Sequence, residues 1–213
     1  MCEKKSYLVF MICCLIFCWN AFAAPAPIDT VSGWKHYYGI AGADTGSYYQ
    51  IGSCKFFEYD DYVIIEKDLN REIGSNIYVK AKKGRQIEIN CEKIIRQNDM
   101  RILNEWAEFF FAKKGDCVFI RSGTGERCNL IIYDMVKKQK IFQTDFSDTI
   151  RFVAKNRLCF WTETSVAEKG SCPEYEKLSH LGIIPIIETK MTLDLPNLVL
   201  IRTPEKKCSY KKE

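Results

Sequence analysis

The sequence predicts a mostly β protein, and three observations lead to this fold class. Short runs rich in β-branched and aromatic residues recur along the chain, they lie about 8–12 residues apart, and turns rich in Gly, Asp, Asn and Lys separate them. Such spacing is typical of an antiparallel sandwich or barrel, or of propeller-like blades built from hairpins. About 12 strands would fill three four-stranded blades, whereas closed propellers begin at about four blades, so sandwich, barrel and propeller-like blades all stay open.

The N-terminus has the pattern of a signal peptide, which we assign to residues 1–23. Lys4 and Lys5 precede an apolar run at residues 7–19, and Ala21 and Ala23 are the small residues that signal peptidase requires. This run is shorter than the ~20 residues needed to cross a bilayer, which disfavours an uncleaved anchor. We therefore expect cleavage after Ala23 and an extracytoplasmic protein, either periplasmic or secreted.

The rest of the chain divides into three parts by composition. Residues 24–47 are rich in Gly, Ala and Pro and predict an extended, irregular N-terminal arm. Residues 48–203 are expected to form a single β-rich domain, a length that one hydrophobic core commonly serves. Residues 204–213 predict a basic, polar tail that frays unless Cys208 ties it down.

The first strands are expected as hairpins. Strands at residues 54–59 and 62–67 flank the turn Asp60-Asp61, and strands at 77–82 and 86–91 flank a turn in which Gly84 supplies a positive φ. Residues 99–112 are ambiguous. Trp106 and its apolar neighbours fit one face of a helix, whereas the run of three phenylalanines and the turn before residue 117 fit a hairpin, and the second half leans to strand.

The second half of the chain continues the β pattern with one interruption. A short helix is expected near residues 172–181, since Pro173 suits a first helical turn and Gly182 suits a helix end. The turn between two of the strands is placed at Asp134 and residues 137–139. The expected strands are residues 117–121, 129–134, 140–144, 149–153, 158–162, 186–195 and 198–202.

Seven cysteines follow residue 23, and in an oxidising compartment they default to disulfides. Cys117 and Cys128 flank one loop and Cys159 and Cys172 the next, so these are the two expected pairs, each worth ~3 kcal/mol. The odd number leaves at least one thiol over. There is no C-x₂-C after residue 23, and only His36 and His180 supply imidazoles, so we expect neither a metal nor a cofactor.

Candidate catalytic residues are not identifiable from the sequence. There is no G-x-S-x-G, and no carboxylate pair stands out. One glycine-rich loop is a candidate for ligand contact, although we favour a plain connection between strands, because it lacks the GK[ST] ending of a phosphate-binding loop. Its residues are Ser122, Gly123, Thr124, Gly125, Glu126 and Arg127.

Charge and compartment narrow the function classes. The formal net charge is +4, and the lysines are scattered in pairs, which does not fit a nucleic-acid-binding face. We expect an exported, non-enzymatic β-rich protein that binds a protein or another envelope component and has no membrane span after signal cleavage. The alternatives are a secreted, disulfide-stabilised effector or enzyme inhibitor, and a hydrolase whose active site is unrecognised.

Overall fold

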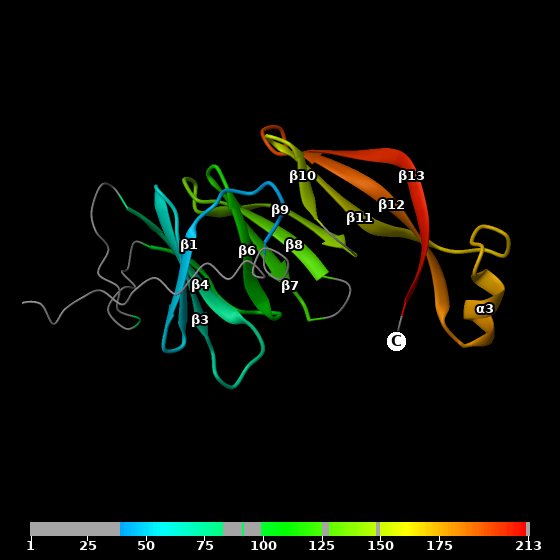
Figure 1. Cartoon of the computed structure of the whole chain (residues 1–213), viewed down its shortest axis with the longest axis horizontal. Coiled ribbons are helices and arrows are strands. Elements are labelled where there is room, and N and C mark those ends of the chain that lie inside the picture. Colours follow the sequence, from blue (N-terminus) through cyan, green and yellow to red (C-terminus); the bar gives the residue numbers. More distant parts are fainter. Residues whose placement is uncertain (1–38, 83–90, 92–98, 125–127, 148–149, 212–213) are drawn as a thin grey trace, which may run out of the picture.

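The structure is a computed structural model that describes residues 39–82, 91, 99–124, 128–147 and 150–211 (Figure 1). Strands make up 61% of it, which confirms the mostly β fold class. They form three antiparallel sheets, and in each sheet neighbouring strands follow one another along the chain. Within the described ranges these strands do not close a barrel, and a sandwich-like arrangement fits them.

Each sheet is a meander of consecutive strands. The first contains β1 (Ser47–Ile51), β2 (Cys54–Glu58), β3 (Tyr62–Asp68), β4 (Ser75–Ala81) and β5 (Met100–Ile102). The second contains β6 (Glu108–Lys114), β7 (Cys117–Ser122), β8 (Cys128–Asp134) and β9 (Gln139–Phe146). The third contains β10 (Arg151–Ala154), β11 (Arg157–Val166), β12 (Ile184–Asp194) and β13 (Val199–Lys211).

The second sheet lies between the other two and is covered on both faces (Figure 1). Val118 and Ile120 of β7 pack in one cluster with residues of the first sheet, whereas Phe119 packs in another with residues of the third. All three side chains are fully buried. Because successive strand residues point to opposite faces, one apolar strand supplies both cores.

The hairpins expected from turn chemistry are present. Asp60 and Asp61 separate β2 from β3, and the turn after Asp134 separates β8 from β9. Residues 99–112 are not helical: they contain β5 and most of β6, so the strand interpretation of the second half is correct. The strand expected at residues 86–91 lies outside the described residues, apart from Cys91.

The expected short helix is α3 (Tyr175–His180), and Gly182 with φ +71° follows its end. In the described part of the chain no helix has the length and apolar character to cross a bilayer. Residues 204–211 continue β13 alongside β12 instead of fraying, and Cys208 within them forms a disulfide with Cys172.

Both predicted disulfide pairs are wrong. The disulfides are Cys54–Cys91 and Cys172–Cys208, and the free cysteines of the described residues are Cys117, Cys128 and Cys159. Their places in the sheets explain this result.

Cys117 begins β7 opposite Asp134, whereas Cys128 begins β8 next to the pair Ser122–Asn129 at the other end of the hairpin. Five strand residues span about 17 Å, far beyond the ~7 Å that a disulfide allows between Cα atoms. Cys172 is bonded to Cys208, which faces Ile187 of β12. Cys159 faces Thr192, five residues away from Ile187 along the same strand. An odd separation also places them on opposite faces of the sheet.

The segment before β1 joins the second and third sheets. Asp44 accepts a hydrogen bond from the Gly115 amide (2.8 Å) and forms an ion pair with the buried Lys113 (3.1 Å). Burial by itself raises the pKa of Asp44, but the Gly115 amide and the Lys113 ammonium outweigh it and lower the pKa below its ordinary 3.8. Nearby, Ala41 bridges to Arg151 of β10. The expected arm is therefore irregular here but firmly docked.

Candidate functional site

Three large apolar side chains are exposed together where the first and second sheets meet. Trp106 is 78% exposed, Ile73 66% and Leu103 60%. Ile73 lies between β3 and β4, and the other two lie between β5 and β6. The two connections are adjacent, because the Asn104 side-chain amide donates to the Ile73 carbonyl at 3.1 Å. We call these three residues the Trp106 surface.

The connection that carries Trp106 is held from below by a buried carboxylate. Glu108 is 4% exposed, and its Oε2 accepts hydrogen bonds from the backbone amides of Glu105 (2.6 Å) and Trp106 (2.7 Å). Ser122 Oγ donates to the Trp106 carbonyl at 2.9 Å, and the Gly123 amide donates to it at 3.1 Å. Trp106 is therefore exposed on an ordered backbone, which is not a usual position for a tryptophan.

The backbone beside Trp106 is also strained. Ala107 has φ +61°, a left-handed conformation that a residue with a Cβ seldom adopts. Gly74 with φ +108° approaches so closely that a Cβ at this position would lie 2.7 Å from the Cα of Ala107 and would collide with Asn104. Strain of this kind persists only where the surrounding contacts impose it, and it is frequent at binding sites.

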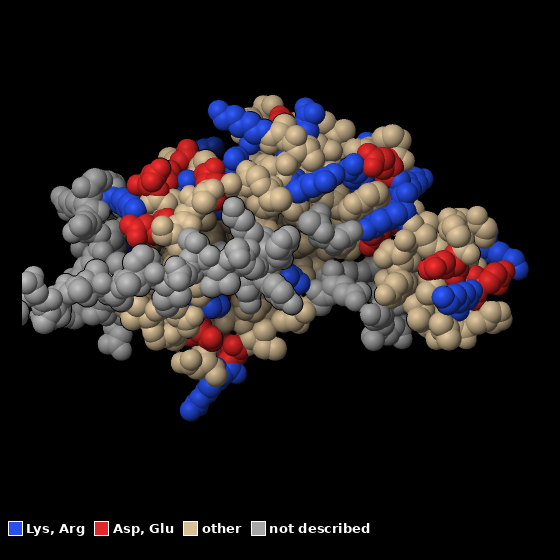
Figure 2. Space-filling model, viewed as in Figure 1, with Lys and Arg blue, Asp and Glu red and all other residues tan. Residues whose placement is uncertain are grey.

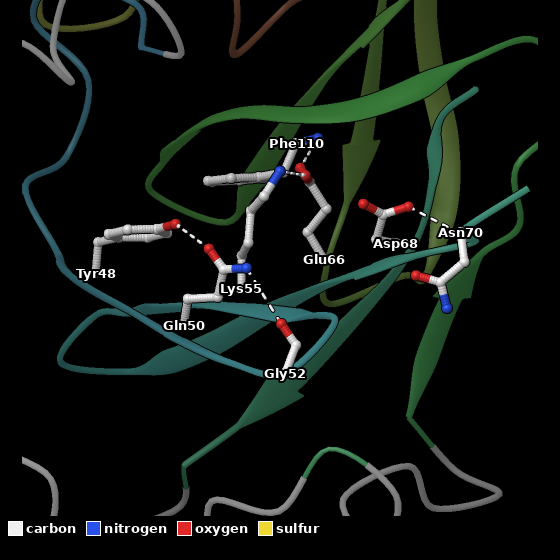
Figure 3. Close-up of polar contacts among 8 residues, drawn as sticks. All are labelled: Tyr48, Gln50, Gly52, Lys55, Glu66, Asp68, Asn70 and Phe110. Atoms are coloured by element: carbon white, nitrogen blue, oxygen red, sulfur yellow. Dashed lines mark hydrogen bonds and ion pairs between the residues drawn. The ribbon is translucent and has the colours of Figure 1, made fainter. Parts of the chain in front are cut away.

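The start of β6 is fixed to the first sheet by a second buried carboxylate, Glu66 of β3. Glu66 accepts a hydrogen bond from the Phe110 amide at 2.9 Å and pairs with Lys55 Nζ at 2.7 Å, as Figure 3 shows. Phe110 follows Glu108 by two residues in β6. The first sheet therefore supports the start of β6, where the Trp106 connection ends.

The glycine-rich loop that the sequence offered as a candidate for ligand contact begins beside this surface. Ser122 is buried, and it and Gly123 bond to the Trp106 carbonyl, so this end of the loop supports the Trp106 connection. Thr124 is described and residues 125–127 lie outside the described residues. The sequence did not identify Trp106 as a surface residue, because its spacing also fits the apolar face of a helix. The signal was the hairpin alternative, in which residue 106 precedes the first strand and falls outside the regular elements.

A second candidate region is a pair of open cavities along β11. Their volumes are about 520 and 650 Å³, and Thr164 and Ser165 line both. The smaller is also lined by Cys128, and the larger by Arg202 and Lys206. They lie on the face of the third sheet that turns toward the second sheet, beyond the core that the two sheets share.

The thiol at the smaller cavity has an arginine beside it. Arg121 Nε donates to Cys128 Sγ at 2.9 Å, and Cys128 is buried. Of the two histidines, His180 is exposed in α3 and lines neither cavity, and His36 lies outside the described residues. Over the described ranges, no three His, Cys, Asp or Glu side chains gather as metal ligands would.

Comparisons with known proteins add no relative: no family model, no curated protein and no solved structure matches this chain. Over the described residues, the class that can be stated is a three-sheet antiparallel β protein with two disulfides, an exposed aromatic surface and two open cavities. Its function has to be inferred from these features.

Proposed function

We propose that this is an exported, non-enzymatic binding protein of the periplasm or cell envelope, and that it contacts a protein partner through the Trp106 surface. The observation that carries the proposal is a tryptophan 78% exposed on a connection that a buried glutamate holds in place. Leaving this much apolar area in water is unfavourable unless a partner covers it.

The chemistry of the Trp106 surface suits a protein partner. Tryptophan is strongly enriched among the residues that dominate protein–protein binding energy, and Leu103 and Ile73 add apolar area around it. A connection already ordered by Glu108 loses little conformational entropy when a partner binds. The strained φ of Ala107 is consistent with a backbone kept for recognition.

The compartment is supported by two independent features. The N-terminal sequence has the basic, apolar and small-residue zones of a signal peptide. The two disulfides weakly favour an oxidising environment. N-terminal sequencing of the purified protein should begin at Ala24, and cell fractionation should recover it outside the cytoplasm, with the envelope for a binding protein and in the medium for a secreted effector.

The binding surface is tested by site-specific cross-linking in the intact cell. A photoreactive amino acid at position 103 should cross-link one major envelope protein, whereas the same group at position 136 should not. Val136 is the control because it is 65% exposed but lies in the turn after β8. With the captured protein purified, Trp106→Ala should weaken binding by about 30-fold or more, the loss expected of a central aromatic residue.

Two results would contradict the proposal. One is cross-linking from position 103 that is no stronger or more selective than from position 136. The other is equal affinity of Trp106→Ala and Val136→Ala for the partner, since a surface that contributes binding energy must respond to loss of its largest side chain. Far-UV circular dichroism of both variants establishes that neither has unfolded.

A further inference from the structure

The larger cavity along β11 is open to solvent and is bounded on one side by a fixed wall. The connection from β11 to α3 begins at the end of β11, and its Cys172 is joined to Cys208 of β13. Ser171 Oγ donates to the Glu168 carbonyl at 2.6 Å and accepts from the Glu168 amide at 2.8 Å. Ala167, which is buried, donates its amide to the Pro185 carbonyl at 2.9 Å. The wall is therefore preformed, as ligand sites commonly are.

Two cations line this cavity without partners of their own. Arg202 and Lys206 of β13 are both exposed, and in the described part of the chain their side chains form neither a hydrogen bond nor an ion pair. They face Met191 and Thr189 of β12, two residues apart, so both lie on the same face of the sheet. Figure 2 shows basic side chains gathered over the part of the molecule where β12 and β13 lie.

The neighbouring cations Lys190 and Lys207 are neutralised, although Lys207 also lines the cavity. Lys190 contacts both carboxylate oxygens of Glu205 at 2.8 Å. Lys207, which follows Lys206 in β13, forms an ion pair with Glu188 at 3.2 Å and lies over the Trp161 ring. Of the three β13 cations whose side chains the structure describes, all line the cavity; Lys207 is neutralised, whereas Arg202 and Lys206 are not.

The smaller cavity adjoins the larger one and has no lysine or arginine among the described residues that line it, whereas the larger has Glu168 beside its cations. The two share Thr164 and Ser165, and the smaller is lined also by Asp145, Glu163 and Ser147. Ser147 Oγ is buried and has no hydrogen-bond partner within the described structure. A buried polar atom without a partner is unfavourable, so this hydroxyl is available to a ligand hydroxyl. The carboxylates accept hydrogen bonds from hydroxyl groups but repel a second anion.

From this arrangement we infer that the two cavities form one binding site for a small acidic sugar, a saccharide that carries a single phosphate, sulfate or carboxylate group. Arg202 and Lys206 bind the anionic group, with Arg202 supplying a forked pair of donors. The hydroxyl-bearing ring lies across Ser165 toward Asp145 and Ser147. Each cavity has a volume within the range of ordinary small-molecule sites, so the pair accommodates a ligand of this size.

The test uses the mature full-length protein with its disulfides intact. Glucose 6-phosphate, glucose 6-sulfate and glucuronate are titrated by calorimetry and ligand-observed NMR, beside glucose and inorganic phosphate. At least one acidic sugar should bind at least tenfold more tightly than glucose and than phosphate, since both ends of the ligand are needed. Which of the three binds identifies the anionic group.

Variants locate the site. Arg202→Ala/Lys206→Ala should weaken binding of the acidic sugar by at least tenfold, and Ser147→Ala should weaken the acidic sugar but not inorganic phosphate. Lys155→Ala/Arg157→Ala is the matched control, because it removes one lysine and one arginine that are exposed at the β10–β11 turn of the same sheet. It should leave binding unchanged.

The inference is overturned if none of the acidic sugars binds at millimolar concentration, if glucose binds as well as they do, or if the control pair of substitutions lowers affinity as much as the cavity pair. It stands apart from the Trp106 surface: Trp106→Ala should leave sugar binding unchanged. Failure of one proposal therefore does not imply failure of the other.

Discussion

Replacing Glu108 should loosen the connection that presents Trp106 and lower the stability of the whole protein. One oxygen of this buried carboxylate accepts hydrogen bonds from the backbone amides of both Glu105 and Trp106. Hydrogen bonds to a charged group contribute about 1.5–3 kcal/mol each. Because water reaches the exposed connection once the carboxylate is gone, we take the lower figure, and Glu108→Ala should reduce the free energy of unfolding by about 3 kcal/mol.

Glu108→Gln should lose only about half as much. The amide oxygen of glutamine at the Oε2 position keeps both hydrogen bonds, but a neutral acceptor is about half as strong as a charged one. The amide nitrogen then faces Ser122 Oγ, which lies 3.4 Å from Oε1 and is free to accept because its own proton is donated to Trp106. We therefore expect a loss of about 1.5 kcal/mol.

Urea unfolding at pH 7 with the disulfides intact, followed by far-UV circular dichroism, measures these differences. The matched control is Glu72→Ala, which removes an exposed carboxylate from the neighbouring connection. The midpoints should fall in the order wild type and control, then Gln, then Ala, with an unchanged slope. If Glu108→Ala unfolds at the same midpoint as Glu72→Ala, the buried carboxylate does not hold the connection and the reasoning is refuted.

Three further predictions concern the cysteines and Asp44. Replacing Cys172 and Cys208 together by serine should lower the free energy of unfolding by about 4 kcal/mol, because the disulfide closes a loop with a sequence separation of 36 in the unfolded chain. Because the pKa of Asp44 is lowered in the folded protein, its ionised form stabilises the fold above about pH 4. This contribution is lost as the pH falls through the folded pKa. The wild type should therefore lose more stability on acidification than Asp44→Asn. Cys117 should react slowly with iodoacetamide at pH 8, since burial, with nearby carboxylates, raises the pKa of its thiol to about 11.

Each of these has a direct control. For the disulfide, reduction of the wild type should cause the loss seen in the double variant plus any loss from opening Cys54–Cys91. For Asp44, Glu72→Ala should keep the wild-type pH dependence, and identical curves for wild type and Asp44→Asn would contradict the sign derived above. For Cys117, the urea-unfolded protein should be alkylated rapidly, and equal rates in both states would show that burial does not protect the thiol.

Local structure was largely predictable, because it depends on neighbours in the chain. The β2–β3 hairpin follows from Asp60-Asp61 between two apolar runs, and the end of α3 follows from Gly182, whose φ of +71° suits glycine. The ambiguity at residues 99–112 had a local cause too. Trp106 and its apolar neighbours fit a helix whereas the three phenylalanines fit a strand, and only pairing of β6 with β7 excludes the helix there.

Patterns among neighbouring residues were enough to predict the β class, the positions of most turns and strands, and the pattern of an export signal. The tertiary structure alone decided the disulfide partners, the exposure of Trp106 and the joining of Arg202 and Lys206 into one cavity. The physical reason is distance along the chain. A turn is set by interactions among adjacent residues, whereas a disulfide or a cavity depends on strand register and on the face that each residue presents. Those are fixed only when the three sheets pack.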